Sequence, residues 1–83
     1  MAAYDGSCLI RRVGINEAGI TMLDLQDTKN AFSWRWFLAK KESNRETLAI
    51  ALAAMTSNKN IEIIVNDTKE YTEIQRIFFL AQG

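Results

Sequence analysis

The side chains best suited to bind a ligand form a short aromatic and basic cluster. Trp34, Arg35 and Trp36 are consecutive in the chain, and Arg11 lies in an earlier segment of similar character. Indole rings stack on nucleobases and sugars, and a guanidinium adds a planar cation. We take these four residues as the candidate ligand-binding site. The alternative, which the small size of the chain favours, is that both indoles fill the core or a subunit interface, because each ring buries a large apolar area.

Residues suited to catalysis or metal binding are scarce. The chain has no His and one Cys, Cys8, so a histidine base and a zinc site of the usual Cys/His type are excluded within one chain. No spacing motif links the carboxylates near the expected strand ends, Asp24, Asp27, Asp67, Glu70 and Glu73. We expect Cys8 to be a small buried residue. The sequence therefore predicts a non-enzymatic protein with no catalytic residue, no metal and no cofactor.

Length and charge narrow the function classes. The 83 residues form one domain over 1–83, of which we expect 1–7 to be a flexible N-terminus. Lys plus Arg and Asp plus Glu number 10 each, so the zero net charge makes nucleic acid and anionic membranes unfavoured partners. No apolar run has the length of a membrane span. The lack of a signal pattern and of a cysteine pair favours the cytoplasm, and a trimmed signal would instead imply secretion.

Alternation of apolar and polar residues predicts the strands that must position these side chains. The expected strands cover 8–15, 20–26, 31–39, 61–66 and 72–81. Arg11 and Arg12 are adjacent and are expected to point to opposite faces of the first strand. Ile74 and Ile77 break the alternation in the last strand, which predicts a bulge there. Gly19, and Asn58 or Asn60, are expected to adopt the left-handed conformation in their turns.

One helix is expected between the third and fourth strands. Ser43 and Glu46 fit a capping box ahead of a helix body over 47–56. The expected core stripe is Leu48, Ala51, Leu52 and Met55. Further apolar residues surround most of the helix, which predicts either that the chain itself covers the helix on both sides or that a second subunit covers it. The expected oligomer interface consists of Ile50, Ala53 and Ala54 on the helix and of Met22, Ile64 and Phe78 on the sheet.

The element order β-β-β-α-β-β predicts the fold class. It is the order of a mostly β, five-stranded OB-like barrel whose helix covers one end. The alternative is an α+β antiparallel sheet with one helix on a face. Periodicity does not distinguish them, because it does not reveal whether a sheet closes.

A pattern of small and apolar residues runs through the second half of the chain. It reads Arg45-x-x-Leu48-Ala49-x-Ala51-Leu52-Ala53-Ala54-x-x-Ser57-x-Lys59-x-Ile61-x-Ile63-x-Val65-x-Asp67, and then Tyr71-x-Glu73-Ile74-x-x-Ile77. This pattern resembles small bacterial OB-fold proteins that are similar to the B subunits of AB5-type toxins, of the subtilase-cytotoxin and pertussis-like kind. The resemblance implies an OB-like barrel that forms a ring, often a pentamer, and binds a glycan.

Two functions remain open from the sequence. The first is a self-associating binding module, a ring-forming glycan-binding protein by resemblance, in which Trp34 and Trp36 stack and Arg35 donates hydrogen bonds. The second is a single-stranded nucleic-acid-binding OB-fold protein, with a groove lined by Arg11, Arg12, Arg35, Lys40 and Lys41. The zero net charge weighs against the second.

Overall fold

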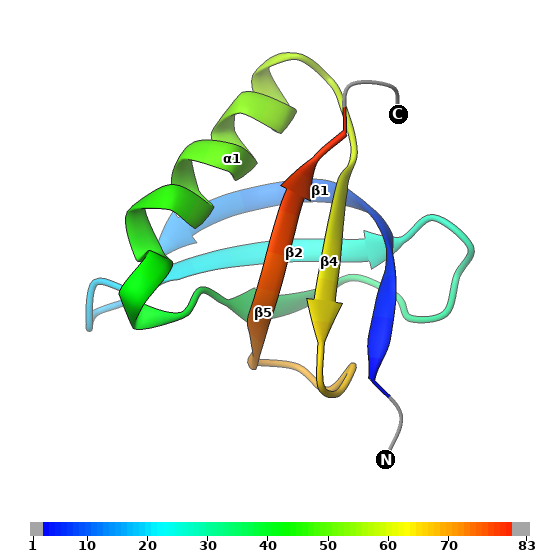
Figure 1. The fold of residues 1–83 in the computed structure, drawn as a ribbon, viewed down its shortest axis with the longest axis horizontal. Helices are drawn as coiled ribbons and strands as arrows, with labels where there is room; N and C mark the ends of the chain where they lie inside the picture. The colour runs from blue at the N-terminus through cyan, green and yellow to red at the C-terminus, as the bar shows by residue number, and fades with distance from the viewer. Residues whose placement is uncertain (1–2, 81–83) are drawn as a thin grey trace.

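The chain folds into a closed β-barrel with one helix (Figure 1). The computed structural model describes residues 3–80, and their elements in chain order are β1 (Tyr4–Ile15), β2 (Thr21–Asp27), β3 (Arg35–Leu38), the 3₁₀ turn η1 (Lys41–Ser43), α1 (Asn44–Thr56), β4 (Ile61–Val65) and β5 (Thr72–Phe79). Neighbouring strands follow the order β1-β2-β3-β5-β4 around the barrel. The predicted element order and the OB-like barrel are therefore confirmed, and the open α+β sheet is not what the chain forms.

The long first strand joins the two halves of the barrel. The N-terminal part of β1 pairs with β4, from Tyr4 to Cys8, and its remainder pairs with β2 up to Ile15. All the strand pairs are antiparallel except β3 with β5, which are parallel at Phe37 and Leu38 only. This short parallel contact closes the barrel, and within residues 3–80 it leaves most of one edge of β5 without a neighbouring strand.

The first and third strands have boundaries that differ from the expected ones. β1 begins at Tyr4, so a flexible N-terminus is wrong for residues 4–7, while residues 1 and 2 lie outside the described part. Sequence periodicity misses this start because Asp5, Gly6 and Ser7 lack apolar alternation. β3 begins at Arg35 and not at residue 31, since a turn precedes it. The expected end of the last strand, Ala81, falls outside the described residues.

The Asp27 carboxylate builds the turn that shortens β3. Its Oδ2 accepts hydrogen bonds from the backbone N–H groups of Lys29 and Ala31, at 3.1 and 2.8 Å. Asn30 in this turn has a positive φ of 64°. These local hydrogen bonds compete with the strand ladder, which is why the chain turns here although its residues alternate.

The helix packs on the barrel through small residues. Thr47, Ala51 and Ala54 are buried, whereas Leu52 and Met55 remain 48% and 40% exposed. The expected core stripe is thus wrong for Leu52 and Met55. Small side chains let the helix backbone lie close to the barrel. Because these small residues face the barrel, the larger side chains on the opposite side of the helix point outward. In residues 3–80, no helix has both the length and the apolar character needed to cross a membrane.

Asparagine residues set both ends of α1. Ser43 is the N-cap, as expected, but its side chain makes no capping hydrogen bond. Asn44 instead connects the helix to the β1–β2 hairpin: its Oδ1 accepts from the Thr21 N–H at 2.7 Å, and its Nδ2 donates to the Gly19 carbonyl at 2.9 Å. After the helix, Asn58 has a φ of 57°, and Gly19 in the hairpin has a φ of 80°, which confirms both predicted left-handed turns.

Candidate ligand-binding face

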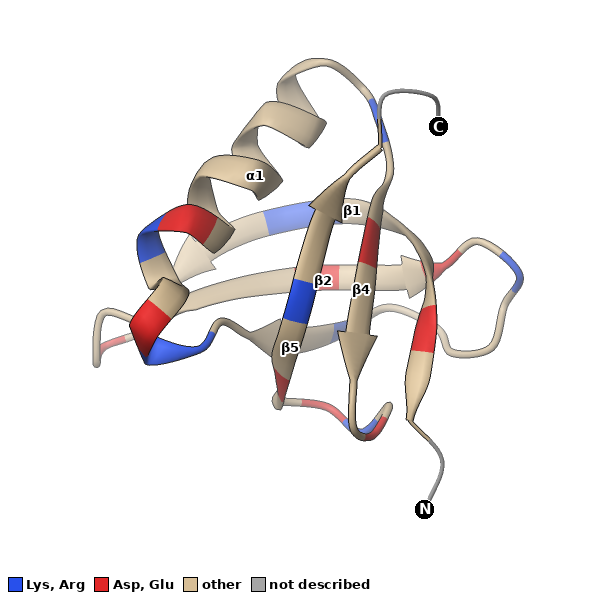
Figure 2. Cartoon of the chain, viewed as in Figure 1, with Lys and Arg blue, Asp and Glu red and all other residues tan. Residues whose placement is uncertain are grey.

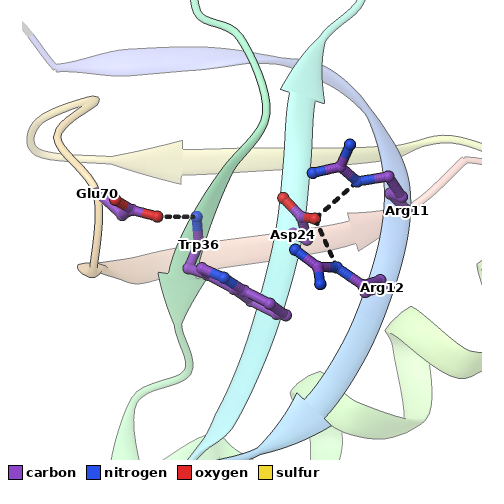
Figure 3. Close-up of polar contacts among 5 residues, drawn as sticks. All are labelled: Arg11, Arg12, Asp24, Trp36 and Glu70. Carbon is purple, nitrogen blue, oxygen red and sulfur yellow. Dashed lines mark hydrogen bonds and ion pairs between the residues drawn. The ribbon is translucent and has the colours of Figure 1, made fainter.

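A bulge in β1 brings two arginines to the same face of the barrel. Ile10 pairs with Leu25 and Arg12 with Asp24, so Arg11 is the extra residue between them. The extra residue shifts the alternation, and both arginine side chains point toward Asp24 on β2 (Figure 3). The expectation that Arg11 and Arg12 point to opposite faces is therefore wrong.

Asp24 is the common partner of both arginines. The Nε atoms of Arg11 and Arg12 donate to the same Oδ2, at 2.8 and 3.0 Å (Figure 3). The Asp24 side chain is only 1% exposed, while those of Arg11 and Arg12 are 49% and 58% exposed. A buried carboxylate thus holds two half-exposed arginine side chains at the surface.

Each of these arginines also lies over an indole ring. The Cζ of Arg11 is 4.7 Å from the centroid of Trp34, and the Cζ of Arg12 is 4.7 Å from that of Trp36. Trp36 is paired with Asp24 across β2 and β3, and Trp34 directly precedes β3. Both indoles are half-buried on the outer side of the sheet. We call this set, Arg11, Arg12, Asp24, Trp34 and Trp36, the Arg–Trp face.

The loop after β4 supports the Arg–Trp face from one side. The backbone N–H of Trp36 donates to Oε2 of Glu70 at 3.4 Å (Figure 3), and the Tyr71 N–H donates to the Trp36 carbonyl at 2.7 Å. Tyr71 adopts a φ of 69° there. These contacts fix the strand that carries Trp36, and they place an acidic side chain close to it.

Arg35 does not join the other candidate binding residues. It pairs with Leu25 across β2 and β3, so its position alternates with that of Trp36. Its Nη1 donates to the Thr68 carbonyl at 2.7 Å and its Nε to the Ser33 carbonyl at 3.1 Å. Arg35 therefore connects β3 to the β4–β5 loop, and two of its five N–H donors are engaged with backbone carbonyls.

The arrangement has clear chemical properties. A guanidinium carries five N–H donors. Of the five N–H donors on Arg11, and likewise on Arg12, only the Nε–H donates to an acceptor within residues 3–80. The terminal nitrogens of both are thus available to a ligand carboxylate or phosphate, while the stacked indoles and Asp24 hold the planar groups in place.

The six predicted interface residues lie in different surroundings. Ala54 is 0% exposed in the core of its own subunit, where contact with another copy is not available to it. Ala53 is exposed on α1, and Met22 and Ile64 are half-buried on β2 and β4. Ile50 and Phe78 line the same groove between α1 and β5.

A second polar cluster lies near the N-terminal end of the barrel. The Tyr4 hydroxyl donates a hydrogen bond to Oδ1 of Asp27 and lies 3.7 Å from the Cys8 sulfur. Burial raises the pKa of Tyr4, and its hydrogen bond to Asp27 raises it further. Burial opposes ionisation of Asp27 as well, but hydrogen bonds from Tyr4 and from the Ala31 and Lys29 N–H groups outweigh it and lower its pKa.

The Cys8 thiol in that cluster is unreactive. Its side chain is fully buried, and burial, together with the nearby Asp27 charge, raises the pKa of the thiol to about 12 despite the hydrogen bond to Tyr4. A thiol is a nucleophile only as the thiolate. The cluster therefore serves the structure of the barrel. Within residues 3–80, no group of His, Cys, Asp and Glu side chains has the arrangement of a metal site.

Sequence reasoning missed two members of the Arg–Trp face. The sequence identifies Asp24 only as one of several carboxylates that no motif links, and it identifies Arg12 as a ligand-binding candidate only in the nucleic-acid alternative. No local signal identifies Asp24, because Leu23-Asp24-Leu25 is the ordinary alternation of a strand with one solvent-facing side. Its cationic partners are recognised only when β2 pairs with β1.

Comparisons of the chain with known protein families, with curated proteins and with solved structures find no match. The fold and the geometry of the face are thus the basis for assigning a function.

Proposed function

We propose that this protein is a non-enzymatic binding module that binds a carboxylate-bearing glycan on the Arg–Trp face. The observation that carries the proposal is the pair of exposed arginines held over Trp34 and Trp36 by the buried Asp24. The same region of OB-like barrels, around strands 2 and 3, is where such folds bind oligosaccharides and oligonucleotides.

The charge of the face favours a glycan over a nucleic acid. Two guanidinium groups around one carboxylate give the Arg–Trp face a single excess positive charge. Glu70 lies beside Trp36, and its negative charge further disfavours a polyanion. A nucleic-acid strand presents a phosphate at every nucleotide and needs several cations along its path. An acidic sugar presents one carboxylate, which matches the charge available here.

The fixed position of the arginines supports this role. A ligand carboxylate accepts two parallel hydrogen bonds from one guanidinium when that group is held in plane. Arg12 is held by Asp24 on its Nε side and by the Trp36 ring on one face, so little of its freedom is lost on binding. The half-buried indoles leave apolar ring surface for the C–H groups of a sugar.

The resemblance to toxin B subunits points to the same ligand class and adds an expectation about assembly. Several copies in one assembly repeat the Arg–Trp face, so weak sites act together on a multivalent glycan. A homo-oligomer thus remains part of the proposal, which depends on the number of faces in the assembly exceeding one and not on a particular number of copies.

The test is a comparison of acidic and neutral ligands. We expect the protein to bind oligosaccharides that end in a uronic or sialic acid, and to bind their neutral analogues at least about tenfold more weakly, since a charge-assisted hydrogen bond contributes more than 1 kcal/mol. Arg12→Ala and Trp36→Ala should both weaken binding to the acidic ligand. Arg45→Ala is the matched control, because Arg45 is exposed on α1, away from the face.

Two results would overturn the proposal. The first is equal binding of acidic and neutral sugars, or no change with Arg12→Ala. The second is salt-dependent binding of an oligo-dT strand that requires Arg12, which would replace the glycan with single-stranded nucleic acid.

A further inference from the structure

One edge of β5 is open along most of its length. On one side, β5 pairs with β4 from Ile61 to Val65, and on the other it pairs with β3 only at Thr72 and Glu73. Within the described chain, no strand pairs with this second edge from Ile74 to Phe79. An open edge presents backbone donors and acceptors, and it serves as a template for another strand.

A groove follows this edge, between β5 and the first half of α1. Its volume is 370 Å³, and its lining includes Glu46 and Ile50 from the helix and Arg76, Ile77 and Phe78 from the strand. Figure 1 shows the helix beside β5, on the side away from β4. The groove thus combines an unpaired strand edge with an apolar floor and two charged side chains.

The open edge itself carries little charge to prevent pairing (Figure 2), although α1 flanks it across the groove. Natural edges are blocked by several charges, by Pro or by a covering element. This one carries Arg76 as its single charge after Glu73, and it ends in Phe78 and Phe79, which are 44% and 45% exposed. Two exposed phenylalanines on an open edge indicate a surface that is covered in the assembled protein.

The charges of the groove indicate what covers it. Glu46 lies on the helix side and Arg76 on the strand side, and among residues 3–80 neither forms an ion pair. A surface that carries one acidic and one basic group is complementary to itself under a two-fold axis, which brings each Arg76 to the Glu46 of the other copy. A second copy of this chain is therefore the occupant that the groove fits.

We infer that two copies associate edge to edge through β5, antiparallel and related by a two-fold axis. The two barrels then share a continuous sheet, β4-β5 of one copy followed by β5-β4 of its partner. Phe78 and Ile50 of each copy, which line the groove, become covered, and Arg76 forms an ion pair with Glu46 of the other copy. The inference is independent of the proposed glycan ligand, because the groove shares no residue with the Arg–Trp face.

The two-fold contact differs from the ring implied by the resemblance. An isologous edge pair closes on itself and gives dimers, whereas a ring needs two different surfaces on each copy. One strand edge and one helix flank form a small interface, so we expect a dissociation constant on the order of 1–100 μM.

Sedimentation equilibrium with charge-reversal variants tests the inference. The wild-type protein should pass from monomer to dimer between about 1 and about 200 μM. Glu46→Arg and Arg76→Glu should each weaken dimerisation by about tenfold or more, because each places like charges together. The double variant E46R/R76E restores opposite charges, and its dissociation constant should return to within about threefold of the wild-type value.

The controls are Arg45→Glu and Glu73→Arg, which reverse charges on the same helix and strand outside the groove. Both should dimerise as the wild type does. Circular dichroism checks that all variants fold, as expected for exposed side chains. A monomer throughout the concentration range, a pentamer, or a dimer that is insensitive to both single reversals would each overturn the inference.

Discussion

The guanidinium carbon of Arg12 on β1 lies 4.7 Å from the centroid of the Trp36 ring on β3, although β2 separates the two strands. Asp24 on β2 is paired with both residues across the sheet. The cation and the ring therefore meet above the carboxylate and cover it, which explains how Asp24 is buried on the outer side of a barrel. This arrangement leads to the first two predictions.

Asp24→Asn should destabilise the fold. The substitution removes the charge that two arginine Nε–H groups share, and hydrogen bonds to charged groups contribute about 1.5–3 kcal/mol. Because both arginines are half exposed to water, we expect a loss of about 1–2 kcal/mol in urea unfolding. Glu17→Gln, at an exposed position of the β1–β2 hairpin, is the control. Equal unfolding midpoints for wild type and Asp24→Asn would show that the pairing contributes nothing to stability.

Arg12→Lys should lower ligand affinity while preserving charge. A lysine ammonium cannot stack in plane on Trp36 or present two parallel donors to a carboxylate. We expect binding of the acidic glycan to weaken by about threefold to tenfold, since cation–π and bidentate contacts contribute about 1 kcal/mol at exposed sites. Titration calorimetry measures the change, with Lys41→Arg as the reverse substitution away from the face. Unchanged affinity would mean that only the charge matters.

Asp27 should make the protein sensitive to acid. Its pKa is lower in the folded protein than in the unfolded chain, so its contribution is present above the unfolded value of about 4 and is lost as the pH falls through the folded pKa. The urea concentration at the unfolding midpoint of the wild-type protein should thus decrease as the pH is lowered from neutral to about 3. Asp27→Asn should be less stable at neutral pH and should lose less on acidification. Parallel pH profiles for the two proteins would contradict the prediction.

Cys8 should resist alkylation until the protein unfolds. Its thiol is fully buried and its pKa is raised to about 12, so almost no thiolate exists near pH 8. Iodoacetamide should modify the native protein at least about a hundredfold more slowly than the protein in concentrated urea. Mass spectrometry follows the single modification. Rapid labelling of the native state would mean that the N-terminal part of β1 separates readily from β4.

Asn44→Ala should loosen the β1–β2 hairpin from the helix. The substitution removes the acceptor of the Thr21 N–H and the donor to the Gly19 carbonyl. We expect a loss of about 1–2 kcal/mol in stability, because a buried backbone N–H is left without a partner. Asn44→Asp keeps the acceptor and loses only the donor, so its loss should be smaller. Faster hydrogen exchange at Thr21 than at Leu25 in the alanine variant would locate the effect.

The two β-bulges show what sequence periodicity can reveal about a strand. The break between Ile74 and Ile77 predicts the bulge in β5, and the register shift across Arg76 and Ile74 confirms it. The bulge at Arg11 leaves only an ambiguous signal. Ile10 and Val13, which both pack against the core, are likewise three residues apart, but Leu9, Val13 and Ile15 also fit an uninterrupted alternation. Only the pairing with β2 distinguishes the two arrangements, and with it the composition of the Arg–Trp face.

The helix shows the same limit. Leu48, Leu52 and Met55 satisfy helical spacing as well as Thr47, Ala51 and Ala54 do, so apolar spacing alone does not identify the buried side. The choice depends on how closely the helix approaches the barrel, which is a property of the assembled strands. Small residues allow the closer approach, and the larger apolar residues remain at the surface.

The local signals of this chain, strand alternation, the capping position and the left-handed Asn58, determine the element order. Closure of the sheet into a barrel depends on the pairing of β3 with β5, which tertiary structure decides. Tertiary structure also decides which of these elements' side chains meet. Arg12, Asp24 and Trp36 come from three strands, and their contact depends on register and on one extra residue in β1. Local propensity acts over a few neighbouring residues, whereas register is set only when strands distant in the chain pair, and so the full membership of the Arg–Trp face could not be predicted from the sequence.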